Sequence, residues 1–361
     1  MSRYSEYIET LSGKVLLGCD GFVDEVYQIV DVRHSPSDFT AMDKLKTFGE
    51  LIVERSDGGV GLEIVHKRRC EGGFAINTGR VAGMLGLQPK LAGLFGAGEL
   101  DPAFSVFSDI CDLVSLGDPA LTLAFEFNDG KVLMSDLKTV ADLTWTDFVD
   151  HFGEAGLKEL FSGIDILGLG YWSLTPDFDN LLKGFVSQYG EGACPRRMFF
   201  DFADIKKKAT ESFRASLALI TEFNAKIPMT LSMNEHEVTE LFSRIGIDVP
   251  APDPSAMPAA LKAARETIAI DELVVHTPAF AAASSKADGE AFAMQETQTE
   301  VIRTAGAGDT FNGGYLCASL GDLSVKERLV IANASTAFFV THATPPTRDE
   351  LIAQIDKARD T

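Results

Sequence analysis

The feature that most constrains the fold is a regular alternation of short apolar runs with longer amphipathic stretches. Five runs are almost wholly apolar and are expected to be buried strands: 14–20, 165–170, 197–202, 229–233 and 272–277. Continuous apolar runs are typical of strands that are covered on both faces. The stretches between them show the spacing of apolar residues expected of helices. This order predicts an α/β fold with a doubly wound, mostly parallel sheet and helices on both faces.

The helical candidates include 37–55, 234–246, 255–270 and 324–343. One stretch, 121–136, instead alternates apolar and polar residues around Asn-Asp-Gly, which predicts a β-hairpin. A hairpin inserted in an α/β chain can form a flap over a site or an ordinary sheet edge. A length of 361 residues is compatible with one large α/β domain, 1–361, that carries such an appendage.

Composition excludes several classes of partner. The formal net charge is −21, from 53 acidic and 32 basic residues, so the surface repels nucleic acid. Apolar runs are far shorter than the ~20 residues that span a bilayer, so we expect no membrane partner. The start of the chain lacks the apolar segment of a signal peptide. The cysteines are odd in number and scattered, as expected of reduced thiols in the cytoplasm: Cys19, Cys70, Cys111, Cys194 and Cys317.

The segment "TAGAGDTFNGG" at 304–314 carries the clearest chemistry. It follows an expected strand at 297–303 and opens an expected helix. Gly306, Ala307 and Gly308 can turn tightly, and their amides at a helix start would form an anion hole. Asp309 then lies beside the bound anion, where a carboxylate is unfavourable unless it accepts a proton. The arrangement indicates phosphoryl transfer, with Asp309 as the catalytic base for an attacking hydroxyl.

A plain alternative is a capped helix behind a glycine-rich turn. Two further glycines, Gly313 and Gly314, lie inside the expected helix, and each costs roughly 0.8–1 kcal/mol relative to alanine. That cost implies close packing or close approach of a ligand. Neither a Walker-type phosphate loop nor a dinucleotide-binding GxGxxG motif is present, so other known phosphate motifs do not explain the segment.

The segment 304–314 resembles the C-terminal signature of the ribokinase/PfkB family of carbohydrate kinases. "GCDGFVDEV" at 18–26 resembles the first strand of that family, which ends in a sugar-binding aspartate. Asp24 is the better match and Asp20 the alternative. "EGGFAINTGRVAGMLG" at 71–86 resembles the N-terminal signature, in which a glycine pair acts as a hinge before a substrate-binding asparagine. The substrate-binding positions carried over by this resemblance are Asp24, Gly72, Gly73 and Asn77.

The resemblance implies a ribokinase-like core with a small β-lid, formed from about 22–34 and 118–137. It also implies ATP as the donor, Mg²⁺ as the cofactor and a sugar-like acceptor. "NEHE" resembles the family's NxxE motif, in which Asn234 and Glu237 order Mg²⁺ through water. The competing interpretation of this pair is a helix cap. Asp201, directly after a buried strand, is an open candidate for lining the same site.

The sequence also departs from the family pattern. Arg303 stands where an acidic residue usually helps to hold a monovalent cation, which argues against such a cation here. Pro278 and Ala281 replace glycines of the usual nucleotide loop, so the adenine side is expected to be shaped differently. A probable insertion, about 37–69, could enlarge the lid or build an interface.

Three functions are compatible with these residues. The first is an ATP-dependent kinase for a sugar or sugar derivative. The second is a sugar- or nucleotide-binding regulator without catalysis, and the third is a nucleoside kinase. Lid-to-lid dimers occur in the family, and the apolar alternation at 121–127 would suit such a homodimer.

Overall fold

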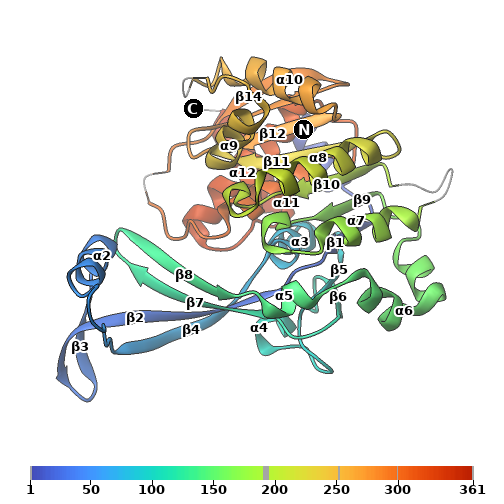
Figure 1. The fold of residues 1–361 in the computed structure, drawn as a ribbon. Helices are drawn as coiled ribbons and strands as arrows, with labels where there is room; N and C mark the ends of the chain where they lie inside the picture. The colour runs from blue at the N-terminus through green and yellow to red at the C-terminus, as the bar shows by residue number, and fades with distance from the viewer. Residues whose placement is uncertain (1, 190–194, 251–252, 299, 360–361) are drawn as a thin grey trace.

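The computed structural model describes residues 2–189, 195–250, 253–298 and 300–359 (Figure 1). Its main sheet has nine strands in the order β14-β13-β12-β11-β10-β9-β1-β5-β6. The strands are β1 (Val15–Gly18), β5 (Lys90–Gly93), β6 (Asp112–Ser115), β9 (Ile166–Leu169), β10 (Arg197–Asp201), β11 (Met229–Asn234), β12 (Glu272–His276), β13 (Phe280–Ser285) and β14 (Gly289–Met294). From β12 to β6 all neighbours run parallel, and β13 runs antiparallel to both its neighbours. The mostly parallel sheet predicted from the sequence is confirmed.

Two apolar clusters, one on each face of this sheet, form the core. The first packs under α5 (Lys138–Asp142), α6 (Trp145–Leu160), α7 (Phe178–Ser187), α8 (Thr210–Asn224), α9 (Glu235–Ile245) and α10 (Met257–Ile268). The second packs under α1 (Arg3–Glu9), α3 (Phe74–Met84), α4 (Pro102–Ser105), α11 (Ala307–Ala318), α12 (Val325–His342) and α13 (Arg348–Arg359). Two short 3₁₀ helices follow β9 and β10: η1 (Trp172–Leu174) and η2 (Ile205–Lys207). Within the described part of the chain, no helix could cross a membrane.

A second, five-stranded sheet projects from the main body (Figure 1). Its strands are β2 (Phe22–Ser35), β3 (Asp38–Ala41), β4 (Ile64–Gly72), β7 (Ala120–Phe127) and β8 (Gly130–Asp136). Strands β7 and β8 form the hairpin that the alternation at 121–136 predicts. The long strand β2 pairs with β4 and β3 in antiparallel fashion and with β7 in parallel. Helix α2 (Leu45–Glu54) lies at the far end of this second sheet.

Two predictions of local structure are wrong. The helix expected over 37–55 is strand β3 followed by the shorter α2, because Asp38–Ala41 pairs with the end of β2. The strand expected over 297–303 is irregular wherever the structure describes it, residue 299 lying outside the description. There, the amides of Ile302 and Arg303 both donate to Val340 O, at 2.8 and 3.1 Å. The segment therefore attaches to the end of α12 and joins neither sheet.

The two glycines inside α11 allow close helix packing. A Cβ on Gly313 would lie 2.6 Å from Val81 Cβ of α3. A Cβ on Gly314 would lie 2.8 Å from Ser335 Oγ of α12. Helix α11 is therefore held between α3 and α12 at distances that only glycine permits. Of the two explanations that the sequence left open for these glycines, close packing is the one observed.

A pair of glycine substitutions tests this packing. Gly313→Ala is expected to lower the free energy of unfolding by about 1–3 kcal/mol, because the added methyl overpacks the contact with α3. Gly49→Ala in α2 is the matched control, since nothing lies within 4 Å of a Cβ there. That change should raise stability by about 0.8–1 kcal/mol through helix propensity alone. Urea unfolding measures both, and effects of the same sign would contradict the account.

Candidate active site

A cavity of about 580 Å³ opens where the carboxyl ends of the main-sheet strands face the second sheet. Ligand sites of open α/β sheets form at this edge. Ala307 is the one predicted site residue that does not line the cavity. The other nine do line it: Asp24, Gly72, Gly73, Asn77, Asn234, Glu237, Gly306, Gly308 and Asp309.

Asp309 lies in the first turn of α11 with its carboxylate at the cavity and 8% of the residue exposed. Its Oδ2 accepts hydrogen bonds from Asn77 Nδ2 at 2.9 Å and from Tyr171 Oη at 3.4 Å. Burial, followed by the charge of Asp201, raises the pKa of Asp309 well above its usual range. A carboxyl group with a raised pKa, held in place by two donors, is suited to accept a proton.

The start of α11 offers free amides next to this carboxylate. Gly306 is the N-cap residue with φ 87°, a left-handed conformation that favours glycine. The amide of Ala307 is already used, because it donates to Thr304 O at 3.1 Å. For the amides of Gly308 and Asp309 no hydrogen-bond partner is found among the described residues. Of the amides predicted at 306–308, those of Gly306 and Gly308 have no partner among the described residues, and the amide of Asp309 is a further free one.

The structure separates the two candidate aspartates near the first strand. Asp20 is 1% exposed, and its carboxylate accepts hydrogen bonds from the amides of Phe74 at 2.6 Å and Ala75 at 2.9 Å. It caps the start of α3, and burial raises its pKa to about 6. Asp24 lies in β2, is partly exposed and lines the cavity. Burial raises its pKa as well. Asp24 is thus the aspartate that a ligand can reach.

Asn234 and Glu237 form the helix cap that was the competing interpretation of this pair. Asn234 Oδ1 accepts hydrogen bonds from the amides of His236 and Glu237, and Glu237 Oε2 accepts one from the amide of Asn234. Both side chains nevertheless line the cavity. Burial, together with the charge of Asp201, raises the pKa of Glu237 to about 8.

The acidic side chains around the cavity fit a divalent cation. Burial is the main cause that raises the pKa values of Asp201, Glu237 and Asp309, and the charge of Asp201 raises those of Glu237 and Asp309 further. A nearby cation would offset this repulsion. No three acidic, histidine or cysteine side chains in the described residues are arranged to hold a metal directly. The donor set therefore fits an Mg²⁺ ion that is bound largely through water, as hard oxygen ligands allow.

Tyr171, Lys131 and His276 are among the lining residues that sequence reasoning missed, and Asp201 was left open. Tyr171 follows β9, Asp201 ends β10 and His276 ends β12. Their common signal is a polar or aromatic residue at the end of a buried run, because parallel strands bring their carboxyl ends to one edge. Lys131 carried no such signal, since it lies in the hairpin of the second sheet.

Comparisons with known proteins show the family and the fold of this chain. A family model described as prokaryotic ketohexokinase matches residues 5–358. The chain belongs to the prokaryotic ketohexokinase family. The ketohexokinase of Haloferax volcanii is 26% identical over 345 residues, which cover 94% of this chain and 90% of that protein. The resemblance to ribokinase/PfkB carbohydrate kinases is confirmed, and the chain is an ATP-dependent sugar kinase.

Solved structures show the same fold. A nucleoside kinase of Methanocaldococcus jannaschii superposes with a TM-score of 0.62 at 15% identity, covering 96% of this chain and 98% of its own. An E. coli protein solved with ATP and Mg²⁺ superposes with a TM-score of 0.63 at 14% identity, covering 96% and 100%. Both likenesses concern the ribokinase-like fold alone.

The structure shows what takes the place of the family pattern at its two departures, the turn after β12 and the position of Arg303. The turn between β12 and β13 has no glycine, because Thr277 Oγ1 accepts hydrogen bonds from the amides of Ala279 and Phe280 at 3.1 and 3.0 Å. Arg303 Nε donates to Ala305 O at 3.1 Å, and its guanidinium lies 5.6 Å from the centre of the Phe339 ring. A fixed positive charge thus occupies the loop before α11.

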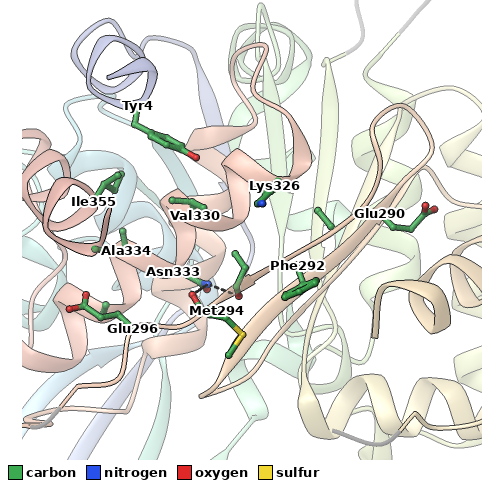
Figure 2. Close-up of a pocket in the computed structure, with 14 residues that line it drawn as sticks. Tyr4, Glu290, Phe292, Met294, Glu296, Lys326, Val330, Asn333, Ala334 and Ile355 are labelled. Carbon is green, nitrogen blue, oxygen red and sulfur yellow. Dashed lines mark hydrogen bonds between the residues drawn. The ribbon is translucent and has the colours of Figure 1, made fainter. Parts of the chain in front are cut away.

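A second cavity, of about 720 Å³, lies between β14 and α12 and is bordered by α1 and α13 (Figure 2). Asn333 Nδ2 joins its two main walls by donating to the carbonyls of Ala293 and Met294, both at 3.1 Å. None of the predicted site residues lines this cavity. The chemistry read from the sequence therefore belongs to the cavity at the sheet edge.

Alanine substitutions at the two aspartates test their assignment. Asp20→Ala should lower the free energy of unfolding by about 1–3 kcal/mol, because it leaves two buried amides of α3 without acceptors. Asp24→Ala should leave stability within about 1 kcal/mol of the wild type and weaken the binding of the acceptor sugar. Chemical unfolding and KM for the sugar measure the two effects. The reverse pattern, with Asp20→Ala stable and impaired only in sugar binding, would exchange the two roles.

Proposed function

We propose that this kinase transfers the γ-phosphoryl group of ATP to a hydroxyl of a ketohexose or a closely related sugar. The observation that carries the proposal is the position of Asp309, at the cavity between Asn77 and the free amides of α11. The ketohexokinase of Haloferax volcanii supports a ketohexose as acceptor, since the two chains align over almost their whole length.

In the proposed step, an acceptor hydroxyl oxygen attacks the γ-phosphorus in line with the bond to ADP. The new bond joins sugar oxygen and phosphorus, and the bond between phosphorus and the β,γ-bridging oxygen breaks. Its electron pair leaves with ADP, and the hydroxyl proton moves to the carboxylate of Asp309. The amides of Gly308 and Asp309 hold the phosphoryl oxygens, and such preorganised donors stabilise the transition state by on the order of 2.7–4 kcal/mol each.

Mg²⁺ near Asn234 and Glu237, bound through water, would neutralise phosphate charge when present. Such a cation would also lower the pKa of Asp309, because it offsets the charge of the neighbouring acids. Asp309 would then be ionised when nucleotide and metal are bound together. The E. coli structural neighbour that was solved with ATP and Mg²⁺ supports this pair of ligands.

Sugar binding is assigned to Asp24, Asn77 and the glycine pair Gly72–Gly73, which lie where the second sheet meets α3. Gly73 has φ 109°, and a Cβ there would lie 2.6 Å from Asp20 Oδ2. We propose that the second sheet is the lid, made from about 22–34 and 118–137, which excludes water when it closes. The insertion at 37–69 supplies β3, α2 and the larger part of β4 to it.

The second sheet carries the exposed side chains of Leu121 and Met134, whereas the exposed Leu133 lines the cavity. Leu121 and Met134 support the homodimer through the lid as a proposal. A cytoplasmic location, without nucleic-acid or membrane partners, is likewise a proposal. It is supported by the net charge of −21 and by four unpaired cysteines, while Cys194 lies outside the described residues.

Asp309→Asn tests the catalytic base. The change keeps side-chain volume and is expected to lower kcat by about 10²–10⁴-fold, because a general base contributes that much. Thermal unfolding and the affinity for Mg²⁺-bound AMP-PNP should stay close to those of the wild type. ADP release is measured with ketohexoses, other sugars, sugar acids, sugar phosphates and nucleosides as acceptors.

The wild type in the same assay decides between the functions. Turnover that is fastest with a ketohexose is the expected result. A preference for nucleosides would make this a nucleoside kinase, and sugar binding without ADP release from any acceptor would indicate a regulator. If Asp309→Asn turns over as fast as the wild type, Asp309 is not the catalytic base.

The monovalent cation gives a separate prediction. Because Arg303 Nε already donates to Ala305 O, the loop before α11 has a built-in positive charge. We expect the initial rate to change less than about two-fold when KCl is replaced by tetramethylammonium chloride at equal ionic strength, since potassium would be repelled there. A rate that depends strongly on potassium would show that the cation binds despite Arg303.

A further inference from the structure

His276 is the last residue of β12 and pairs with Asn234 of β11 at the cavity edge. It lines the same cavity as Gly308 and Asp309. Its ring packs against the Phe311 ring of α11, with the centres 4.8 Å apart. The residue therefore connects the end of a core strand with the first turn of α11.

The Nε2 atom of His276 is buried and has no hydrogen-bond partner in the described part of the chain. Leaving such a group unsatisfied costs roughly 1–3 kcal/mol. Buried polar atoms without partners are uncommon in folded proteins and call for a specific explanation. Packing against Phe311 accounts for the ring of His276 and leaves its nitrogen unexplained.

The unsatisfied nitrogen lies beside the free amides of α11. Nε2 is 3.7 Å, and Cε1 3.1 Å, from the position that a Cβ would take on Gly308. Glycine at this position leaves room between the imidazole and the helix start. His276 Nε2 and the amides of Gly308 and Asp309 are thus polar groups without a partner among the described residues, and all three residues line the same cavity.

This assignment rests on the proposed kinase function: we propose that His276 Nε2–H donates a hydrogen bond to the transferred phosphoryl group, beside the amides of Gly308 and Asp309. His276 is then a further catalytic residue, which acts through the N–H of Nε2.

The test compares His276→Phe with His276→Gln. Phenylalanine keeps the ring on Phe311 and removes the donor, whereas glutamine keeps a side-chain N–H. We expect His276→Phe to lower kcat/KM for ATP about ten-fold or more, as the loss of a hydrogen bond to a charged group predicts, and His276→Gln to recover part of it. His151→Phe in α6 is the matched control, since His151 also packs at 4.8 Å against a phenylalanine ring and is exposed.

Binding measurements separate donation from packing. Calorimetry with Mg²⁺ compares AMP-PNP, which carries a γ-phosphoryl group, with AMP, which does not. His276→Phe should weaken AMP-PNP several-fold, leave AMP affinity unchanged and leave the melting temperature unchanged or higher, because it also removes the unsatisfied buried nitrogen. Equal losses for both nucleotides, a matching drop in melting temperature, or unchanged kinetics would overturn the assignment. Should the wild type phosphorylate no acceptor, the proposed function fails, while the comparison of AMP-PNP with AMP still decides on His276.

Discussion

The close packing of α11 between α3 and α12 is the constraint on which the site depends. Because Gly313 and Gly314 have no side chain, α3 and α12 pack so close to α11 that a methyl group at either position would clash with them. The first turn of α11 is thereby fixed against α3, where Asn77 meets Asp309. A catalytic carboxylate must be positioned to a fraction of an ångström, and a helix held on two sides supplies that rigidity. The glycines that look flexible in the sequence thus serve to immobilise the site.

The site contains buried acids and polar groups that lack partners in the described part of the chain, and bound ligands would stabilise them. Asp201, Glu237 and Asp309 lie around one cavity with pKa values raised mainly by burial, and the charge of Asp201 disfavours ionisation of Glu237 and Asp309 as well. The same cavity also has free amides and an imidazole nitrogen without a hydrogen-bond partner among the described residues, and these groups can bind an anion. An anionic nucleotide with its cation satisfies both groups together. In the proposed function, binding of both would offset the cost of these groups in the protein alone, and metal and nucleotide would then bind cooperatively.

Much of the candidate site could be predicted from the sequence, because several of its residues are close together along the chain. The segment around Asp309 holds its turn, its helix start and its carboxylate within a few positions. The resemblance favoured Asp24 over Asp20, but the residues alone do not separate them, since they are four positions apart and only the turn into β2 shows which one lines the cavity. His276 and Tyr171 were missed because they reach the site through the alignment of separate strands. Strand β3 was missed because its partner in β2, and not its own propensity, makes it extended.

The strand β2 has a mechanical consequence. It runs continuously from Phe22 to Ser35, so Asp24 near its start and the turn into β3 at its end belong to one rigid ribbon. A strand of that length spans about 45 Å at ~3.3 Å per residue. Rotation by about ten degrees at its root would sweep the tip through about 8 Å, by the same geometry. A small rotation near Asp24, the carboxylate proposed to bind the sugar, would therefore move the distal end of the second sheet much further than Asp24 itself.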